Sequence, residues 1–529
     1  MAGRMWRLWG SLARRPALAV CFVAVFSFFS NFAVSRIIGM PQPRVHDEFS
    51  YLLAGDTFAH GRLTNPTHPL WRHFETLHVL HQPTYMSKYP PGQGLMLAAG
   101  QAFLGHPAFG VWLEVAIMAA AVAWMLYAWV PPRWAVLGGF LAAFHFGFTN
   151  YWSHSYWGGA LPAFGGALVW GALRRLLGGR AVVRSSLLFG AGLSVLACTR
   201  PYEGLVSSLP AGLLLLISFF RNSNRSPALL LPAFLMAGLA AGGLAFYNRA
   251  VTGNPWTMPL TVYEDQYSTA PIFIWQKPRP SPVFRSKIME EYDRQYSRRW
   301  FDRRRSVPES PENFFTTIGV FWSKAAFFYF TPLLWIPFLA AFFRLGRDRW
   351  LLFIFACVFL PLILAIAVTG TFSQYHYYAP VAGLFMLFVC EGLRYLRAIR
   401  IPGPYRKYRN AVILAFAAGV LLLNAKSVFE PVSFPRPVPR TPVEEELMKT
   451  PGPHLVLVRY APDHWVHQEW VYNGADIDAS PVVWAREQGG GADGELLEYY
   501  PDRHVWILEA DLNPFRLEHV RSPRTKAPG

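Results

Sequence analysis

The sequence predicts an all-α polytopic membrane protein with a small extracytoplasmic α/β domain at its C-terminal end. The first observation is composition, since 53% of the 529 residues are hydrophobic, 15% are charged and the mean hydropathy is +0.22. Soluble domains carry roughly 25% charged residues. The second is a series of apolar runs, each long enough to approach the roughly 20 helical residues that cross a bilayer. The third is that arginine and lysine gather on alternate connections between these runs.

A hydropathy window of about 19 residues predicts about eleven membrane-spanning helices. They lie near 17–37, 109–130, 134–150, 158–176, 185–199, 204–220, 228–247, 317–343, 350–369, 378–396 and 411–428. The stretch 91–105 is apolar but short and rich in glycine, so we expect a juxtamembrane or re-entrant helix there. All four cysteines fall inside apolar runs, and neither a disulfide framework nor metal-type cysteine spacing is visible.

Basic residues predict the orientation of these helices. With the N-terminus in the cytoplasm, every short inside connection is basic, and the short outside turns contain only Arg200. This distribution explains the net charge of +17 without a nucleic-acid partner. A cleaved signal peptide is the alternative for the N-terminus, because Ala33, Val34 and Ser35 resemble a cleavage site, but the apolar run before them is long for a signal peptide. Three long segments then lie outside: 38–108, 248–316 and 429–529.

The outer end of the chain predicts a separate unit. Residues 1–428 form the predicted transmembrane domain, the Pro-rich stretch 429–442 is interpreted as a stiff linker, and 443–529 form a small α/β domain. Within it, HLVLVRY and HVWILEA predict strands, and DIDASPVVWARE predicts a loop entering a helix. Four aromatic side chains would pack in its core or stack on sugars: Trp465, Trp470, Tyr472 and Trp484.

Two adjacent carboxylates, Asp47 and Glu48, open the first outer segment in the stretch RVHDEFSYLLAGD. Phe49, Leu52 and Leu53 fall on one helical face, so we expect this helix to lie flat at the membrane surface. A carboxylate there could act as a general base on a hydroxyl group. The structural alternative is that acidic residues simply favour the first turn of a helix.

Basic and aromatic residues recur at the same outer face. Lys88 precedes two prolines in HQPTYMSKYPPGQG and is placed to meet a lipid phosphate, with snorkelling as the alternative. The turns TRPYEG and YNRAVTGNPW add Arg200 and Arg249, which suit a phosphate. Tyrosines and histidines at this depth suit a sugar or form only an aromatic belt. The candidates for substrate contact are Tyr85, Tyr202, Glu203, His376 and Tyr377.

Metal-binding patterns are weak. The stretch HPLWRHFETLHVLH contains four histidines and a glutamate, but no two histidines are spaced i,i+4, so it matches no metal signature. A divalent cation, Mg²⁺ or Mn²⁺, at Asp47 is left open, and no other metal or cofactor is expected. The basic stretch 285–305 predicts an interfacial helix that is solvated or binds lipid headgroups, or a surface that captures an anionic donor or acceptor.

The motifs HDE, KYPP, TRPYEG, TGNP and HYYAP together resemble bacterial GT-C-type glycosyltransferases, the broad group of protein O-mannosyltransferases and lipid A aminoarabinose transferases. The resemblance covers most of residues 17–428, and KYPP departs from the plain Lys-Pro-Pro form. It implies a polyprenyl-phosphate-linked sugar donor and catalysis on the outer face. It also implies that Asp47, with Glu48 beside it, is the base or orients the acceptor, and that Lys88 contacts the phosphate. Arg200 and Arg249 are added by position and charge.

The expected function is therefore sugar transfer, as a hexosyl- or pentosyltransferase, to a hydroxyl of a glycan, lipid or protein acceptor. A single displacement would invert the anomeric centre. The expected location is the bacterial inner (plasma) membrane, with a cytoplasmic N-terminus and a periplasmic or extracellular C-terminal domain. Alternatives are an oligosaccharide transferase or ligase that uses a lipid-linked glycan, a transporter, and a non-enzymatic lipid scaffold. A transporter would show charged residues within its spans and corresponding broken helices.

Overall fold

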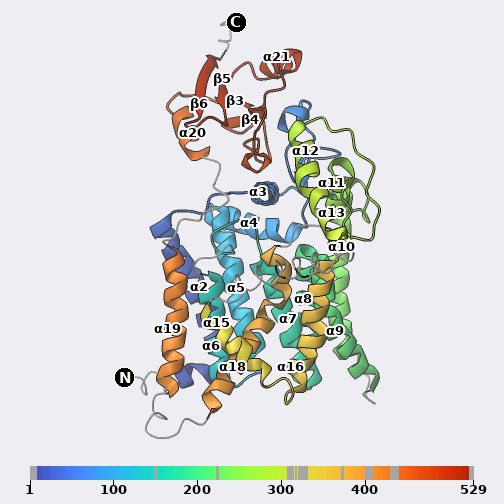
Figure 1. The fold of residues 1–529 in the computed structure, drawn as a ribbon, viewed down its shortest axis with the longest axis vertical. Coiled ribbons are helices and arrows are strands. Elements are labelled where there is room, and N and C mark those ends of the chain that lie inside the picture. Colours follow the sequence, from blue (N-terminus) through green and yellow to red (C-terminus); the bar gives the residue numbers. More distant parts are fainter. Residues whose placement is uncertain are drawn as a thin grey trace.

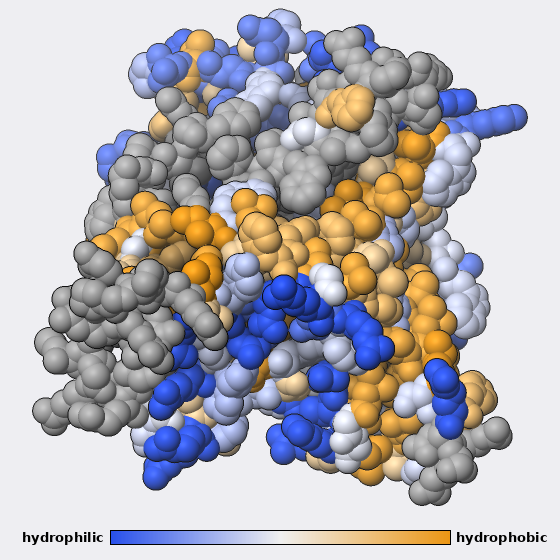
Figure 2. Space-filling model, turned by 60° about the horizontal axis from the view of Figure 1, so that its bottom comes forward, coloured by the Kyte–Doolittle hydropathy of each residue, from blue (hydrophilic) through white to orange (hydrophobic). Residues whose placement is uncertain are grey.

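A helix bundle forms one end of the molecule, and a cap of loops with a small sheet domain forms the other (Figure 1). The computed structural model describes residues 9–147, 152–221, 226–306, 315, 319, 332–370, 374–399, 409–428 and 440–523. Figure 2 shows hydrophobic side chains on the flank of the bundle and hydrophilic ones at the end away from the sheet domain. That distribution suits a bundle whose flank faces lipid.

Most of the predicted spans coincide with helices of the bundle. Seven helices in the described ranges are long and apolar enough to cross a membrane, so the protein is an integral membrane protein. The count of about eleven crossings stays a prediction, and residues 320–331 of the span predicted at 317–343 lie outside the described residues. The bundle helices are α2 (Pro16–Ile38), α5 (Pro107–Leu126), α6 (Pro132–Gly147), α7 (Ala160–Leu177), α8 (Val182–Thr199), α9 (Pro201–Arg221), α10 (Leu231–Thr252), α15 (Pro332–Phe342), α16 (Arg349–Ile354), α17 (Leu360–Ala367), α18 (Ala382–Ala398) and α19 (Arg409–Val428).

Two helices lie across the upper end of the bundle, α3 (His46–Ala59) and α4 (Pro91–Leu104) (Figure 1). As expected for 91–105, α4 is not among the candidate membrane crossings. It is held against α5 where Gly110 meets its backbone, since a Cβ on Gly110 would lie 2.0 Å from the carbonyl oxygen of Met96. Only glycine permits this approach, and it fixes the helix that begins just after Lys88.

The apolar face of α3 does not lie on a membrane surface, and that expectation is wrong. The ring of Phe49 stacks on Tyr472 of the C-terminal domain with centroids 4.2 Å apart. Leu53 belongs to the same buried cluster as Leu455 and Val505 of that domain. The face is covered by protein because the sheet domain offers it an apolar partner.

Between residues 253 and 306 the second outer segment contains α11 (Pro259–Tyr267), α12 (Lys287–Tyr292), a π-helical turn (Asp293–Arg298) and α13 (Arg299–Arg305). The last three follow one another without a break, so a helix runs through most of the stretch 285–305, and its place at the membrane surface stays a prediction. One of its arginines, Arg304, is buried and donates hydrogen bonds to the carbonyls of Ile366 and Thr369 at the end of α17. This part of the basic stretch therefore joins the outer segment to the bundle.

The C-terminal unit is a four-stranded sheet with the strand order β4-β3-β5-β6. β3 runs parallel to β4 and β5, and β6 is antiparallel to β5. The predicted strands HLVLVRY and HVWILEA correspond to β3 and β5. Its elements are α20 (Arg440–Leu447), β3 (His454–Arg459), β4 (Val482–Arg486), α21 (Gly490–Tyr499), β5 (His504–Glu509) and β6 (Arg516–Arg521).

One prediction for this unit is wrong. The stretch DIDASPVVWARE forms strand β4, which is buried along its whole length, and the helix α21 begins only after it. The two β-branched residues Val482 and Val483 favour a strand at this position. Trp470, Tyr472 and Trp484 pack in the interior, as the core alternative expects. Most of the linker predicted at 429–442 lies outside the described residues.

Candidate active site

A cavity of about 1450 Å³ lies between the helix bundle and its cap. Its walls come from the start of α3, the chain before α4, the turn between α8 and α9, the outer helices α11 to α13, and the 3-10 turn Tyr375–Val381 that precedes α18. The fold brings eight of the ten predicted site residues to this one cavity: Asp47, Glu48, Lys88, Arg200, Tyr202, Glu203, His376 and Tyr377.

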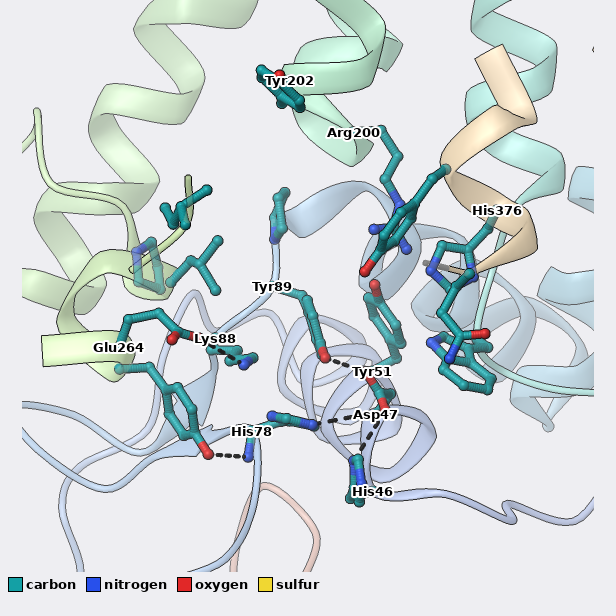
Figure 3. Close-up of a pocket in the computed structure, with 18 of the residues that line it drawn as sticks. His46, Asp47, Tyr51, His78, Lys88, Tyr89, Arg200, Tyr202, Glu264 and His376 are labelled. Carbon is teal, nitrogen blue, oxygen red and sulfur yellow. Dashed lines mark hydrogen bonds and ion pairs between the residues drawn. The ribbon is translucent and has the colours of Figure 1, made fainter. Parts of the chain in front are cut away.

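Asp47 lies in the first turn of α3, with its side chain 15% exposed toward the cavity. The Tyr89 hydroxyl donates a short hydrogen bond to one carboxylate oxygen. The other oxygen lies 3.0 Å from Nδ1 of His46 and 3.8 Å from Nε2 of His78 (Figure 3). Burial by itself raises the pKa of Asp47, but His78, His46 and Tyr89 outweigh it and hold the pKa well below its usual range. Asp47 is therefore ionised at neutral pH, as a general base must be.

Glu48, the next residue, is 1% exposed and bonded to backbone. Its two oxygens accept hydrogen bonds from the amides of Arg44, at 3.0 Å, and Tyr156, at 2.9 Å. Burial raises the pKa of Glu48 to about 7. Both carboxylate oxygens are already engaged with the backbone, so the geometry describes an anchor for the chain around the cavity.

Two histidines flank Asp47 (Figure 3). His78 has a backbone φ of 64°, in the left-handed region, and its amide donates to the hydroxyl of Tyr263 at 2.9 Å. Burial, followed by the charge of Lys88, lowers the pKa of His78, and the Asp47 carboxylate opposes them. His46 is buried and contacts a histidine of the C-terminal domain, His467, with 2.8 Å between Nε2 and Nδ1.

These three side chains form a group that fits a cation. The ligand atoms of His46, Asp47 and His78 all lie within 4.8 Å of one another. Two imidazoles and one carboxylate suit Zn²⁺ or Mn²⁺ better than Mg²⁺, which prefers oxygen ligands. His73, from the histidine-rich stretch, points elsewhere, since its Nδ1 lies 3.0 Å from the carbonyl oxygen of Arg486.

Two cations face Asp47 across the cavity. Lys88 is 8% exposed, donates to Glu264 at 3.1 Å and lies over the ring of Tyr263 at 4.2 Å. Arg200 caps the end of α8, and its guanidinium lies 5.1 Å from the ring centre of Tyr377. Within the described part of the chain, no carboxylate forms an ion pair with Arg200. Its charge is available to an anion that enters the cavity.

The remaining predicted residues have other surroundings. Arg249 is exposed near the end of α10 and is not a lining residue, and Tyr85 donates its hydroxyl to the carbonyl of Asn473 in the C-terminal domain. Tyr202 donates to the carbonyl of Ala365 at the edge of the cavity. His376 is buried beside Trp157, with ring centroids 5.4 Å apart.

Several lining residues escaped sequence reasoning. His46 and Tyr89 adjoin Asp47 and Lys88, so the motifs themselves could have pointed to them. Glu264, Tyr292 and His467 lie far along the chain, and no local pattern marks them. Only the folded chain brings them to the cavity.

No protein-family model and no curated protein matches the chain. Solved structures do. The oligosaccharyltransferase AglB of Archaeoglobus fulgidus, tethered with an acceptor peptide, matches at a TM-score of 0.48 and 11% identity over 93% of this chain and 69% of that chain. The same protein with an inhibitory peptide and a dolichol-phosphate matches at 0.45 and 13%, over 83% and 62%. ArnT from Cupriavidus metallidurans, in the apo state, matches at 0.49 and 14%, over 96% and 93%.

These matches are similarities of fold alone. The chain spans 63% of the first oligosaccharyltransferase chain, against 93% of ArnT. At these identities and TM-scores the similarity assigns no role to any residue, so the chemistry has to come from the cavity itself.

Proposed function

We propose that the protein is a membrane-bound glycosyltransferase that moves a sugar from a polyprenyl-phosphate-linked donor to an acceptor hydroxyl. One observation carries the proposal: a single cavity holds the ionised carboxylate of Asp47 together with the cations Lys88 and Arg200. A base for a hydroxyl and positive charge for a phosphate are the two requirements of this reaction. A volume of about 1450 Å³ leaves room for a donor headgroup and an acceptor together.

The reaction is a single displacement. The acceptor oxygen attacks the anomeric carbon of the sugar while Asp47 takes the proton of the hydroxyl. The bond between the anomeric carbon and the phosphate oxygen breaks, and its electron pair leaves with the lipid phosphate. Lys88 and Arg200 stabilise the negative charge of that leaving group. Attack from the side opposite the phosphate inverts the anomeric centre.

The surroundings of the cations suit a lipid donor. Leu205 of α9, Leu244 of α10 and Ile366 of α17 also line the cavity, and the polyprenyl chain would follow this apolar wall. In the structure Lys88 is paired with Glu264, so the donor phosphate would take the place of that carboxylate. The predicted topology, with a cytoplasmic N-terminus, puts the cavity on the outer face of the membrane.

A cation is a separate part of the proposal. His46, Asp47 and His78 would hold it, and it would supply Lewis-acid stabilisation of the departing phosphate. Chelation followed by addition of Mn²⁺ or Mg²⁺ tests this directly. We expect any restored activity to be larger with Mn²⁺, because of the two nitrogen ligands.

The deciding experiment uses purified protein with a panel of radiolabelled polyprenyl-phosphate sugars and lipid-linked oligosaccharides. Wild type is compared with Asp47→Asn and with a matched control, Asp302→Asn. Asp302 of α13 is exposed, pairs with Arg298 and does not line the cavity.

We expect transfer by wild type and by the Asp302 variant, and transfer slowed about 10²- to 10⁴-fold by Asp47→Asn. Full activity of Asp47→Asn would reject Asp47 as the base. Transfer only from oligosaccharide donors would favour the second candidate, an oligosaccharide transferase, which the size of the cavity also allows. No transfer from any donor would reject the function.

A further inference from the structure

We propose that His467, in the C-terminal domain, is a positioning residue for the catalytic carboxylate, and that this domain thereby completes the active site. The inference rests on the proposed function, since it takes Asp47 as the base. His467 lies in the 3-10 turn Val466–Gln468, between β3 and β4, and is a lining residue of the cavity. Its partner, His46, is 421 residues away in sequence.

The three side chains form a line. Nδ1 of His467 lies 2.8 Å from Nε2 of His46, and Nδ1 of His46 lies 3.0 Å from Oδ2 of Asp47. The two rings lie edge to edge, with centroids 5.0 Å apart and planes 25° apart, as an in-plane contact between ring nitrogens requires. His46 therefore connects the carboxylate to the C-terminal domain through its two ring nitrogens.

The chemistry of imidazole limits how the two histidines can hydrogen-bond to each other. A neutral imidazole carries hydrogen on only one nitrogen. One of the two facing nitrogens, Nδ1 of His467 and Nε2 of His46, therefore donates and the other accepts, and the contact exists in either arrangement. It fixes the ring orientation of His46, whose Nδ1 lies beside Asp47. An outer histidine that orients an inner one in this way acts as the third group of a catalytic triad does.

The turn that carries His467 is held from several sides. The indole of Trp465 donates to the hydroxyl of Tyr296 at 3.1 Å, and the ring of His467 meets Tyr296 edge-on with centroids 4.2 Å apart. Further along the same connection, the amide of Ala475 donates to Asp56 at 2.7 Å. The turn is therefore docked on α3 and on the outer helices, as a positioning role requires.

A neighbouring histidine supplies the contrast. His464 is buried in the same connection and pairs with Asp511 of the C-terminal domain, at 2.6 Å. It does not line the cavity. His464 supports the fold of its own domain, whereas His467 reaches out of that domain to His46.

The test compares substitutions that differ in one hydrogen-bonding group. In His467→Asn the side-chain amide lies where Nδ1 was, in His467→Gln it lies near the position of Nε2, and His467→Ala has no such group. We expect kcat to fall about 10- to 100-fold in the Ala and Gln variants, the usual cost of losing an outer hydrogen-bond partner. The Asn variant should keep most of the wild-type kcat, and the donor KM should stay unchanged throughout.

Two further measurements separate positioning from folding. His464→Ala removes a histidine from the same connection and should leave kcat near wild type. Added imidazole should restore part of the activity of His467→Ala by filling the space of the missing ring. A purely structural role would show equal losses in the Asn and Ala variants and no response to imidazole, and either result would overturn the proposal.

Failure of the inference is distinguishable from failure of the proposed function. If Asp47→Asn is slowed as expected while His467→Ala has the wild-type kcat, only the role of His467 is rejected. If wild type transfers no sugar, the function is rejected, and the contact is then tested by thermal unfolding of His46→Ala, His467→Ala and the double variant. Additive shifts in Tm would show that the two rings do not interact and would reject the line of contacts as well.

Discussion

Asp47 and Glu48 are adjacent carboxylates in the first turn of α3, and they lie in opposite surroundings. Asp47 faces the cavity among a tyrosine and two histidines, which keep it ionised. Glu48 points into packed protein, where backbone amides occupy both of its oxygens and burial favours its neutral form. Successive residues of a helix point about 100° apart, so one turn serves both surroundings. Their partners, and not their residue type, decide which one is fit for catalysis.

The largest expected effect is on kcat, and it should come from Asp47 and not from Glu48. Asp47→Asn should lower kcat by about 10²- to 10⁴-fold, because the amide cannot accept the hydroxyl proton. Asp47→Glu should lose about 100-fold, since the extra methylene displaces the carboxylate by more than 1 Å. Single-turnover rates with the active donor measure both. A Glu variant as fast as wild type would show that the carboxylate needs no fixed position.

The next largest effect is the contribution of Glu48 to the pH dependence of stability, which the Gln variant separates from that of other buried carboxyl groups such as Glu75. The pKa of Glu48 rises from 4.5 to about 7 in the folded protein. Between these values the unfolded chain loses a proton that the native state keeps, so stability falls as pH rises through this window and levels off above pH 7. The decline should reach about 3 kcal/mol. Denaturation of wild type and Glu48→Gln at pH 5 and pH 8 measures it, and the Gln variant should lack this component.

Removing the Glu48 side chain should cost stability without changing chemistry. Glu48→Ala leaves the amides of Arg44 and Tyr156 without acceptors, and we expect a loss of about 2 kcal/mol. A fitting control is Glu446→Ala, since Glu446 is exposed and, among the described residues, pairs only with Lys449. That pair should contribute less than about 1 kcal/mol. A large kcat defect in properly folded Glu48→Ala would contradict the division between the two carboxylates.

Lys88 is one of the two cations that face Asp47, and it should affect donor binding. Lys88→Met should raise the donor KM about tenfold, because one charge on the phosphate is lost. Lys88→Arg should lose less, since it retains the charge in a different geometry. An Arg249→Met variant provides the matched control, because Arg249 lies outside the cavity. Equal KM values in the two Met variants would remove Lys88 from the phosphate site.

The smallest effect concerns the partner of Lys88. Glu264→Gln removes a negative charge that competes with the donor phosphate for Lys88. We expect the donor KM to fall a few-fold, with kcat little changed. Titration of donor at constant acceptor measures this. A rise in KM would mean instead that Glu264 contacts the donor or holds Lys88 in its binding position.

Local sequence patterns are enough to predict most of the helices in the fold. Apolar runs predict helices because each span must satisfy its own backbone in lipid, and the helices appear where those runs lie. The strand β4 was mistaken for a loop and helix because it is short, and its neighbour β3 is recognised only in the folded sheet. The face of α3 was assigned to a membrane for a similar reason. Its apolar pattern demands a partner without saying which one.

The site was predictable only in part. Asp47 and Lys88 stand in local motifs at the ends of spans, and their shared depth suggested that they meet. Glu48 illustrates the limit, since nothing in the sequence says that its oxygens are taken by distant amides. His467 carries no local signal at all, because its contact with His46 depends on how a separate domain docks.

Because His467 comes from the C-terminal domain, the proposed active site can be complete only after that domain has been synthesised and has docked. His46 enters the growing chain 421 residues before His467. At synthesis rates of about 5 to 20 residues per second, roughly 20 to 80 seconds separate the two. During that interval the first loop and most of the bundle already exist, yet Asp47 lacks its full set of neighbours. Under the proposed function, the site would thus become active only after the C-terminal sheet domain has folded against α3.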